Sequence, residues 1–230
     1  MAAEICPTVL AGSAEEFQQQ VARVTAFAPR IHIDLADGRF APTKTIGLDQ
    51  AWWPANVRAD LHVMYQEPFR HTKLLLKLQP QLIIVHAEAE GDFVAFAEQA
   101  HAHGIEVGVA LRAETMPQTI EPALPWIDHV LIFSGHLGHF GGQADTHLLT
   151  KVLHLRQQKP SLEIGWDGGI NNQNAHILAA GGVDVLNTGG FIQHASDPQA
   201  AYESLQATVG DYPYQEAAQQ KPGPPARRLV

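Results

Sequence analysis

Two histidines and two aspartates occur where buried polar side chains could act together. RIHIDLADGRF contains His32 and Asp34, ADLHVMY contains His62, and EIGWDGG contains Asp167. Two imidazoles and two carboxylates form a mixed ligand set that suits a divalent transition metal such as Zn, Fe(II), Mn or Co. Burying such groups without a partner is costly, and binding a metal is one way to offset that cost. The alternative is that each is a separate hydrogen-bonded polar residue of the core, and the spacing leaves both interpretations open.

The pattern around His32 and Asp34 indicates where these side chains point. Ile31, Ile33 and Leu35 alternate with them, and successive side chains of a strand point to opposite faces. A half-exposed strand would leave the polar face in water. A strand buried on both faces would instead direct His32 and Asp34 into the protein interior.

The rest of the chain predicts the elements that position these residues. Several short apolar runs are almost continuous in Val, Ile and Leu, as parallel strands buried on both faces are. We expect strands within 4–10, 30–36, 59–65, 81–88, 106–112, 129–135, 163–169 and 183–190, and helices within 17–27, 67–78, 92–104, 146–158, 172–182 and 198–209.

Eight such βα units predict an α/β fold, a single (β/α)8 TIM barrel with its active site at the carboxyl ends of the strands. An open doubly wound sheet would need a Gly-rich fingerprint after the first strand, which TVLAGSAEE lacks. The segment 42–57 is the poorest helix candidate. We place the barrel domain at 1–209, and we expect the Pro-rich, polar segment 210–230 to be a disordered tail.

Composition restricts the compartment and the partners. The net charge is −9 and no basic stripe is present, which argues against nucleic acid as the main partner. The single cysteine, Cys6, excludes an internal disulfide and fits a reducing cytoplasm, where we expect the protein to reside. The start MAAEICPTVLAG predicts no signal peptide. No apolar run approaches the ~20 residues of a membrane span, so no membrane partner is expected.

Several motifs resemble those of the ribulose-phosphate 3-epimerases. HIDLADGRFAPTKTIG resembles the family signature H-x-D-x-M-D-G-x-F-x-P-N-x-x-x-G, and FGGQ matches the loop after the sixth strand. DLHVM, IIVHAE and EIGWDGGIN resemble the motifs of strands three, four and seven, and the matches run in family order from about residue 5 to residue 198. The resemblance implies one divalent transition metal held by His32, Asp34, His62 and Asp167. It also implies that Asp34 and Asp167 are the two catalytic acid–base carboxylates.

The implied reaction is epimerisation at C3 of a ketose phosphate, D-ribulose 5-phosphate to D-xylulose 5-phosphate, as in the pentose phosphate pathway. Removing the proton next to the carbonyl gives a cis-enediolate with charge on two adjacent oxygens, which a metal can chelate as a Lewis acid. Two carboxylates on opposite faces of that plane then serve as base and acid and exchange roles with the direction of reaction.

Backbone N–H groups are the expected phosphate donors, because no Lys or Arg stands at the obvious mouth positions of the later strands. FGGQ, DGGI and TGGF are tight turns on consecutive mouth loops, and loops after strands seven and eight form the usual barrel phosphate site. A single Gly pair is more often only a turn, whereas three are more specific. The expected partners are a small-molecule sugar phosphate and further copies of the chain in a homo-oligomer. The expected substrate-binding residues are Thr8, Met64, Phe140, Gly141, Gly142, Gly168, Gly169, Gly189 and Gly190.

The sequence departs from the family around the substrate and keeps the ligands. Ala36 and Phe133 replace two of the family's three methionines, which leaves Met64. The loop FSGHLGHFGGQ is one residue longer than the usual form and carries His136 and His139. We hypothesise that one of these histidines reaches the mouth and contacts the substrate. The alternative is that both are solvated loop residues.

Three other functions compete with the implied one. A related epimerase could act on a hexulose phosphate such as allulose 6-phosphate, and a catalytically silent barrel could serve as a binding module. The related decarboxylase and hexulose-phosphate synthase barrels use an Asp-x-Lys-x-x-Asp motif in strand three, and DLHVMY contains no lysine. On strand four, His86 and Glu88 are expected beside the ligands or within the core rather than on the metal.

Overall fold

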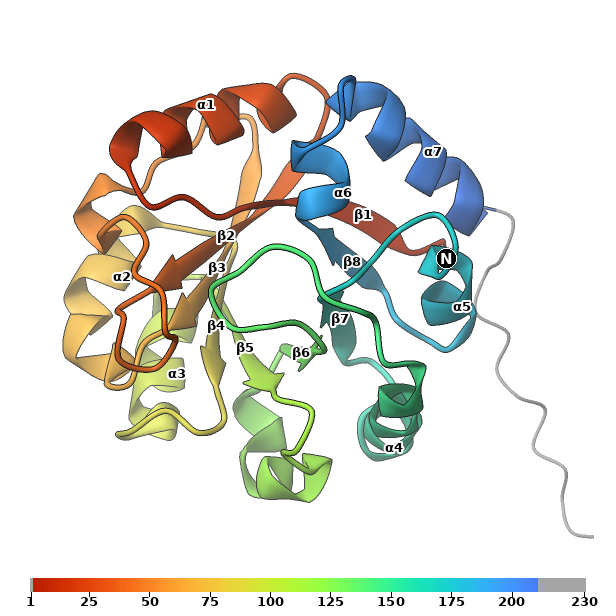
Figure 1. Ribbon diagram of the computed structural model, residues 1–230. Coiled ribbons are helices and arrows are strands. Elements are labelled where there is room, and N and C mark those ends of the chain that lie inside the picture. Colours follow the sequence, from red (N-terminus) through yellow and green to blue (C-terminus); the bar gives the residue numbers. More distant parts are fainter. Residues whose placement is uncertain (1, 211–230) are drawn as a thin grey trace, which may run out of the picture.

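Eight parallel strands form a closed barrel in the computed structural model, which describes residues 2–210 (Figure 1). The strands pair in chain order and β8 pairs with β1, so the sheet has no free edge. The predicted TIM barrel is confirmed. The strands are β1 (Glu4–Val9), β2 (Arg30–Ala36), β3 (Arg58–Met64), β4 (Leu82–His86), β5 (Glu106–Leu111), β6 (His129–Phe133), β7 (Glu163–Asp167) and β8 (Val185–Thr188).

Helices surround the barrel, as Figure 1 shows, but two connections hold only 3-10 turns. The poor helix candidate 42–57 forms a single turn, η1 (Leu48–Gln50), and the connection after β5 forms η3 (Pro117–Thr119) and η4 (Glu121–Trp126). Pro125 lies inside η4, and a proline cannot donate the backbone hydrogen bond that a longer helix needs. The helices are α1 (Ala14–Thr25), α2 (Thr72–Leu78), α3 (Phe93–Ala102), α4 (Leu149–Gln158), α5 (Ala175–Ala180), α6 (Gly190–Gln193) and α7 (Pro198–Gly210), with η2 (Pro68–His71) before α2 and η5 (Thr146–Leu148) before α4.

The last helix ends one residue beyond the predicted barrel boundary. Helix α7 includes Gly210, and the rest of the segment for which a disordered tail is expected, 211–230, lies outside the described residues. Within residues 2–210, no helix combines the length and apolar character that crossing a membrane requires.

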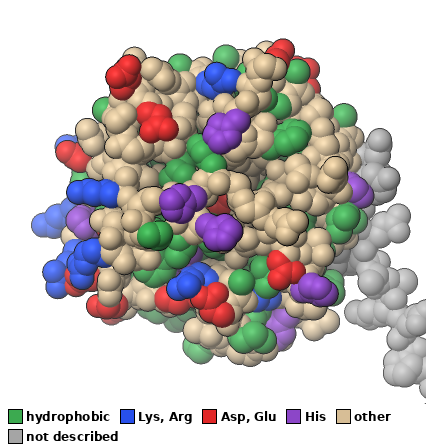
Figure 2. All heavy atoms as spheres, in the orientation of Figure 1, with side chains coloured by type: hydrophobic (Ala, Val, Ile, Leu, Met, Phe, Trp, Pro, Cys, Tyr) green, Lys and Arg blue, Asp and Glu red, His purple; other side chains and the backbone are tan. Residues whose placement is uncertain are grey.

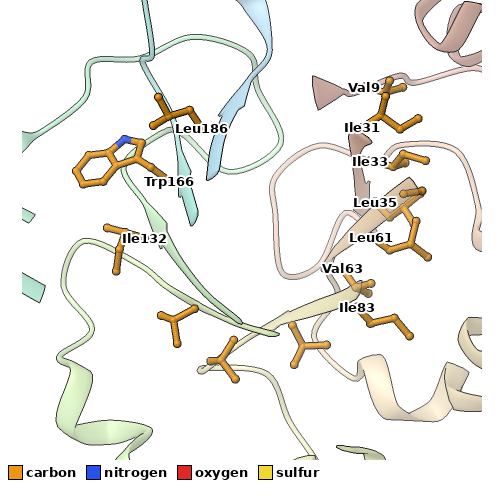
Figure 3. Packing of buried hydrophobic residues seen from close by; sticks show 14 of the residues in the cluster. Val9, Ile31, Ile33, Leu35, Leu61, Val63, Ile83, Ile132, Trp166 and Leu186 are labelled. Carbon is orange, nitrogen blue, oxygen red and sulfur yellow. The ribbon is translucent and has the colours of Figure 1, made fainter. Parts of the chain in front are cut away.

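Strand β2 is buried on both faces. Ile31, Ile33 and Leu35 have no exposed surface and belong to the apolar core between the strands and the helices (Figure 3). Since side chains alternate along a strand, the intervening His32 and Asp34 point into the barrel. Both are buried there, which confirms the orientation predicted from the sequence.

An ionic network fills the barrel interior at the amino ends of the strands. Arg30, the first residue of β2, donates through Nε to Asp60 at 2.7 Å and through both terminal nitrogens to Glu163 at 3.0 and 2.9 Å. Glu163 also contacts His129 at 2.7 Å. Burial opposes ionisation of Glu163, but the hydrogen bonds from His129 and Arg30 outweigh it and hold its pKa well below the usual range. This network closes the amino end of the barrel, and the carboxyl ends of the strands remain for chemistry.

Candidate metal centre and active site

Strand register brings the four predicted ligands together. β2 and β3 pair so that Asp34 lies opposite His62, and His32 lies on the same face of β2 as Asp34. Asp167 is the last residue of β7. One ligand atom from each of these four residues lies within 4.8 Å of the others. The cluster that the sequence predicts therefore exists at one end of the barrel.

The distances within the cluster fit a shared cation. His62 Nδ1 lies 2.8 Å from Oδ1 of Asp34 and 3.7 Å from Oδ2 of Asp167. His32 Nε2 lies 3.3 Å from Asp34 Oδ1 and 4.0 Å from Asp167 Oδ2. His32 is fully buried, and neither of its ring nitrogens has a hydrogen-bond partner within residues 2–210. A buried imidazole lone pair facing two carboxylates is what a bound metal would satisfy, and two nitrogens with two oxygens suit a divalent transition metal.

The two carboxylates differ in proton affinity. Burial disfavours the charged form of Asp34, but His32 and His62 outweigh it and hold the pKa of Asp34 well below its usual range. Burial and the neighbouring charge of Asp34 raise the pKa of Asp167 to about 7. Paired carboxyl groups with opposite pKa shifts are typical of acid–base sites. A cation between them would favour the ionised form of Asp167 as well.

A cavity opens above the cluster at the carboxyl ends of the strands. Asp34 and Asp167 form part of its lining, and Figure 2 shows a hollow on this face with histidine side chains around it. Gly142 is not among the residues that line the cavity, although its neighbour Gly141 is. The other predicted substrate-binding residues all line it: Thr8, Met64, Phe140, Gly141, Gly168, Gly169, Gly189 and Gly190.

The turn after β7 requires glycine. Gly168 has φ +112°, and a Cβ there would lie 2.3 Å from the backbone nitrogen of Gly135. Gly169 has φ +72°, and its Cβ would lie 2.2 Å from the backbone nitrogen of Ala144. Both conformations disfavour other residues, and the close approach leaves no space for a side chain. The turn therefore packs directly on the loop after β6 and fixes the backbone next to Asp167.

The loop after β6 lies across the mouth of the barrel (Figure 1). Leu137 packs against the apolar group of Ala36, Ala41 and Met64, so it occupies space beside the small Ala36 side chain. Thr43 donates a hydrogen bond of 2.8 Å to the Gly138 carbonyl and ties this loop to the one after β2. These two contacts hold the loop after β6 against residues of β2 and of the loop that follows it.

His136 and His139 both line the cavity. Both are exposed, so their rings reach solvent as well as the mouth. The expectation that a loop histidine reaches the mouth is confirmed, and contact with the substrate stays a prediction.

Asn187 is a site residue that the sequence interpretation missed. It lies opposite Asp167 in the β7–β8 register, is 2% exposed and lines the cavity. Neither atom of its side-chain amide has a hydrogen-bond partner among the described residues, and a buried unpaired amide is costly. A bound polar ligand would satisfy it. The available signal was a polar residue within the apolar run VDVLNTGG, near the carboxyl end of a predicted strand.

Comparisons with known proteins agree with this geometry. A family model described as the ribulose-phosphate 3 epimerase family matches residues 4–192. A ribulose-phosphate 3-epimerase of Schizosaccharomyces pombe is 28% identical over 90% of this chain and 94% of its own length. An enzyme of the same name from Helicobacter pylori is 30% identical over 88% of this chain and 96% of its own length. One from Mycobacterium leprae is 31% identical over 90% of this chain and 95% of its own length.

Solved structures share the fold at lower sequence identity. A 3-hexulose-6-phosphate synthase is 19% identical, with a TM-score of 0.69 over 91% of this chain and 100% of the synthase chain. A 3-keto-L-gulonate-6-phosphate decarboxylase from Vibrio cholerae is 10% identical, with a TM-score of 0.67 over 92% and 99% of the two chains. These similarities support the barrel alone. The family match, which spans most of the chain and includes all four residues of the cluster, shows that the chain belongs to the ribulose-phosphate 3-epimerase family, whose named enzymes are carbohydrate epimerases of the isomerase class.

Proposed function

We propose that this protein is a metal-dependent epimerase that inverts C3 of a ketose phosphate and converts D-ribulose 5-phosphate to D-xylulose 5-phosphate. The observation that carries the proposal is the position of Asp34 and Asp167. The two carboxylates lie with two buried imidazoles in one cluster at the floor of a mouth cavity. The relatives named as ribulose-phosphate 3-epimerases supply the substrate class.

The metal would be held by His32, Asp34, His62 and Asp167, with Zn, Fe(II), Mn and Co as the candidate ions. When bound, such an ion supplies Lewis-acid stabilisation for negative charge on the two adjacent substrate oxygens of a cis-enediolate. The His32 ring nitrogens, which have no hydrogen-bond partner among the described residues, and the mixed nitrogen and oxygen donors support this assignment.

The two aspartates carry the proton transfers. One carboxylate removes the C3 proton from one face of the substrate, and the other carboxylic acid delivers a proton to C3 from the opposite face. Asp34 comes from β2 and Asp167 from β7, and both line the cavity, which supports a role for each in proton transfer. Because the reaction is reversible, the roles exchange with its direction.

We assign binding of the phosphate and of the sugar hydroxyls to the other residues of the cavity. Glycines of the turns after β6, β7 and β8 line the cavity, and their backbone N–H groups are the proposed phosphate donors. Thr8 and Asn187 are buried residues of the lining whose side-chain polar atoms have no hydrogen-bond partner within residues 2–210, and we assign them to hydroxyl or carbonyl groups of the sugar.

A coupled enzyme assay tests this function. Purified protein should form xylulose 5-phosphate from ribulose 5-phosphate, lose activity with a chelator and regain it when a divalent transition metal is restored. Absence of turnover of ribulose 5-phosphate in the metal-loaded protein would contradict the proposal, and absence of turnover of a hexulose phosphate as well would favour the silent barrel.

A second candidate substrate is a hexulose phosphate such as allulose 6-phosphate. The observation that favours it is a further cavity lined by Arg112, Glu114 and Pro42, which shares Phe133 and His136 with the first cavity. The second cavity therefore adds the polar side chains of Arg112 and Glu114 beside the first cavity. Rates on the two sugar phosphates, measured side by side with the same metal, separate the two candidates.

The compartment and the assembly complete the proposal. Cys6 is a free, fully buried thiol, which suits the cytoplasm as the proposed location. Self-association into a homo-oligomer stays a prediction, and sedimentation velocity over a range of protein concentrations checks it.

A further inference from the structure

Both ring nitrogens of His62 contact polar side chains. Its Nδ1 faces Asp34 and Asp167 in the ligand cluster. Its Nε2 lies 2.9 Å from Nε2 of His86, the last residue of β4. His62 has no exposed surface and His86 is 2% exposed, so bulk water does not compete for this contact.

The contact continues from His86 to a carboxylate. His86 Nδ1 lies 3.5 Å from Oε2 of Glu88, a distance longer than an ordinary hydrogen bond that still carries an electrostatic interaction. The other carboxylate oxygen of Glu88 accepts a hydrogen bond from Thr115. The His86 ring also packs against the Phe40 ring, with 4.7 Å between centroids. His86 is therefore held in place independently of His62.

The positions of the protons follow from the contacts. A hydrogen bond between two imidazole nitrogens needs one N–H and one lone pair. If His62 gives the lone pair of Nδ1 to a metal, its proton must be on Nε2, and His86 Nε2 must accept. The proton of His86 then lies on Nδ1, which is the nitrogen that faces the Glu88 carboxylate. One arrangement of protons thus satisfies every contact from the ligand cluster to Glu88.

We propose that His86 is a positioning residue that holds His62 in the tautomer and orientation needed to bind the metal, with Glu88 fixing the tautomer of His86. The inference rests on the metal site proposed above. A histidine that binds a metal usually donates its other N–H to such a partner, and loss of that partner typically weakens metal binding about 10–100-fold. Here the partner is a second imidazole. We call the series from the Glu88 carboxylate through the His86 and His62 imidazoles to the metal the relay.

Zinc affinity, measured by competition with a chromophoric chelator, tests the relay through two substitutions. His86→Leu has no acceptor, and we expect zinc to bind about 10–100-fold more weakly. His86→Gln keeps the polarity of the relay, because its amide oxygen can accept from His62 and its NH2 group can donate to Glu88. It should therefore bind zinc far more tightly than His86→Leu does.

His129 supplies a matched control. It is also a buried strand histidine beside a glutamate, but it lies in the network at the amino end of the barrel. His129→Leu should keep wild-type zinc affinity even if it lowers the melting temperature. Wild-type affinity in His86→Leu, or equal losses in the Leu and Gln variants, would overturn the relay. Failure of the wild-type chain to bind zinc, Fe(II), Mn or Co would overturn the metal site itself, and the relay with it.

The tautomers of His62 and His86 can also be measured by NMR in the wild-type protein, so this test does not require that the variants fold. In ¹⁵N-histidine-labelled, zinc-loaded protein, long-range ¹H–¹⁵N spectra should show His62 protonated on Nε2 and His86 protonated on Nδ1. The opposite tautomer at His86 would rule out the proposed direction of the hydrogen bond.

Discussion

His62 and Asp34 face each other in the β2–β3 register, with 2.8 Å between His62 Nδ1 and Asp34 Oδ1. Two neighbouring strands of a closed barrel hold the pair, so a shift of one residue in either strand would turn a ligand to the opposite face. Ligands on strands are held more firmly than ligands on loops. The cluster of His32, Asp34, His62 and Asp167 is therefore built into the register of the sheet, and the loops above it are free to differ.

We predict one divalent transition metal per chain. Elemental analysis after mild purification should find it, and His62→Ala should release it, because that change removes one of the four proposed ligands. His103→Ala, on an exposed histidine, is the matched control and should keep the metal. A folded, fully active protein without metal would contradict this prediction.

Asp34→Asn and Asp167→Asn should each abolish epimerisation. General acid–base assistance is typically worth about 10²–10⁴-fold, and both side chains are also proposed ligands. Because the carboxylates serve opposite faces, a variant with one remaining base can still exchange the C3 proton of the substrate with solvent deuterium. Turnover and deuterium incorporation are measured together, and a variant that keeps most of its turnover would disprove the two-carboxylate mechanism.

Replacing both His136 and His139 with alanine should raise KM or lower kcat and leave the metal content unchanged. Both residues line the cavity, but neither belongs to the metal cluster. His147→Ala, an exposed histidine outside the lining, serves as the control. Steady-state kinetics on the better of the two sugar phosphates decides the matter: unchanged constants in the double variant would leave these histidines without a role in the reaction.

Gly168→Ala should destabilise the protein more than Gly104→Ala does. Both glycines have positive φ, so both changes incur strain of about 1–2 kcal/mol. At Gly104 nothing lies within 4 Å of the added Cβ, whereas at Gly168 the Cβ would lie 2.3 Å from the Gly135 nitrogen. Urea unfolding compares the two, and equal losses of stability would show that the close approach has no effect. Gly168→Ala should also lower kcat, since its backbone N–H interacts with the Asp167 carboxylate.

Glu163→Gln should change how stability depends on pH. The pKa of Glu163 is lower in the folded protein than the usual 4.5. Its ionised form therefore stabilises the folded state above about pH 4.5, and this contribution is lost as the pH falls below that value. The free energy of unfolding should be lower in Glu163→Gln than in wild type at pH 7, and the difference should shrink as the pH falls from 4.5. If the difference in unfolding free energy between the two proteins is the same at every pH, the pKa of Glu163 is not lowered by folding.

The barrel and the ligand set could be predicted from the sequence because both depend on local patterns. The alternation of Ile31, Ile33 and Leu35 with polar residues identifies the two faces of a strand. Motifs that resemble those of the epimerase family, in the same order along the chain, imply the four residues of the ligand cluster. The same local signal marked 42–57 as the poorest helix candidate, and this connection holds only the 3-10 turn η1. It did not reveal that the connection after β5 would also hold only 3-10 turns.

Contacts between distant segments depend on how the strands register and how side chains pack, and periodicity carries no information about either. The packing of Leu137 against Ala36 and the 2.9 Å contact between His62 and His86 each join residues far apart in the chain. The β7–β8 pairing that sets Asn187 opposite Asp167 does the same. The sequence by itself thus determined which side chains point into the barrel and which chemical groups they bring. Only the closed sheet decided which of those groups touch, because barrel closure sets the distance between strands and leaves each buried polar atom a limited choice of partners.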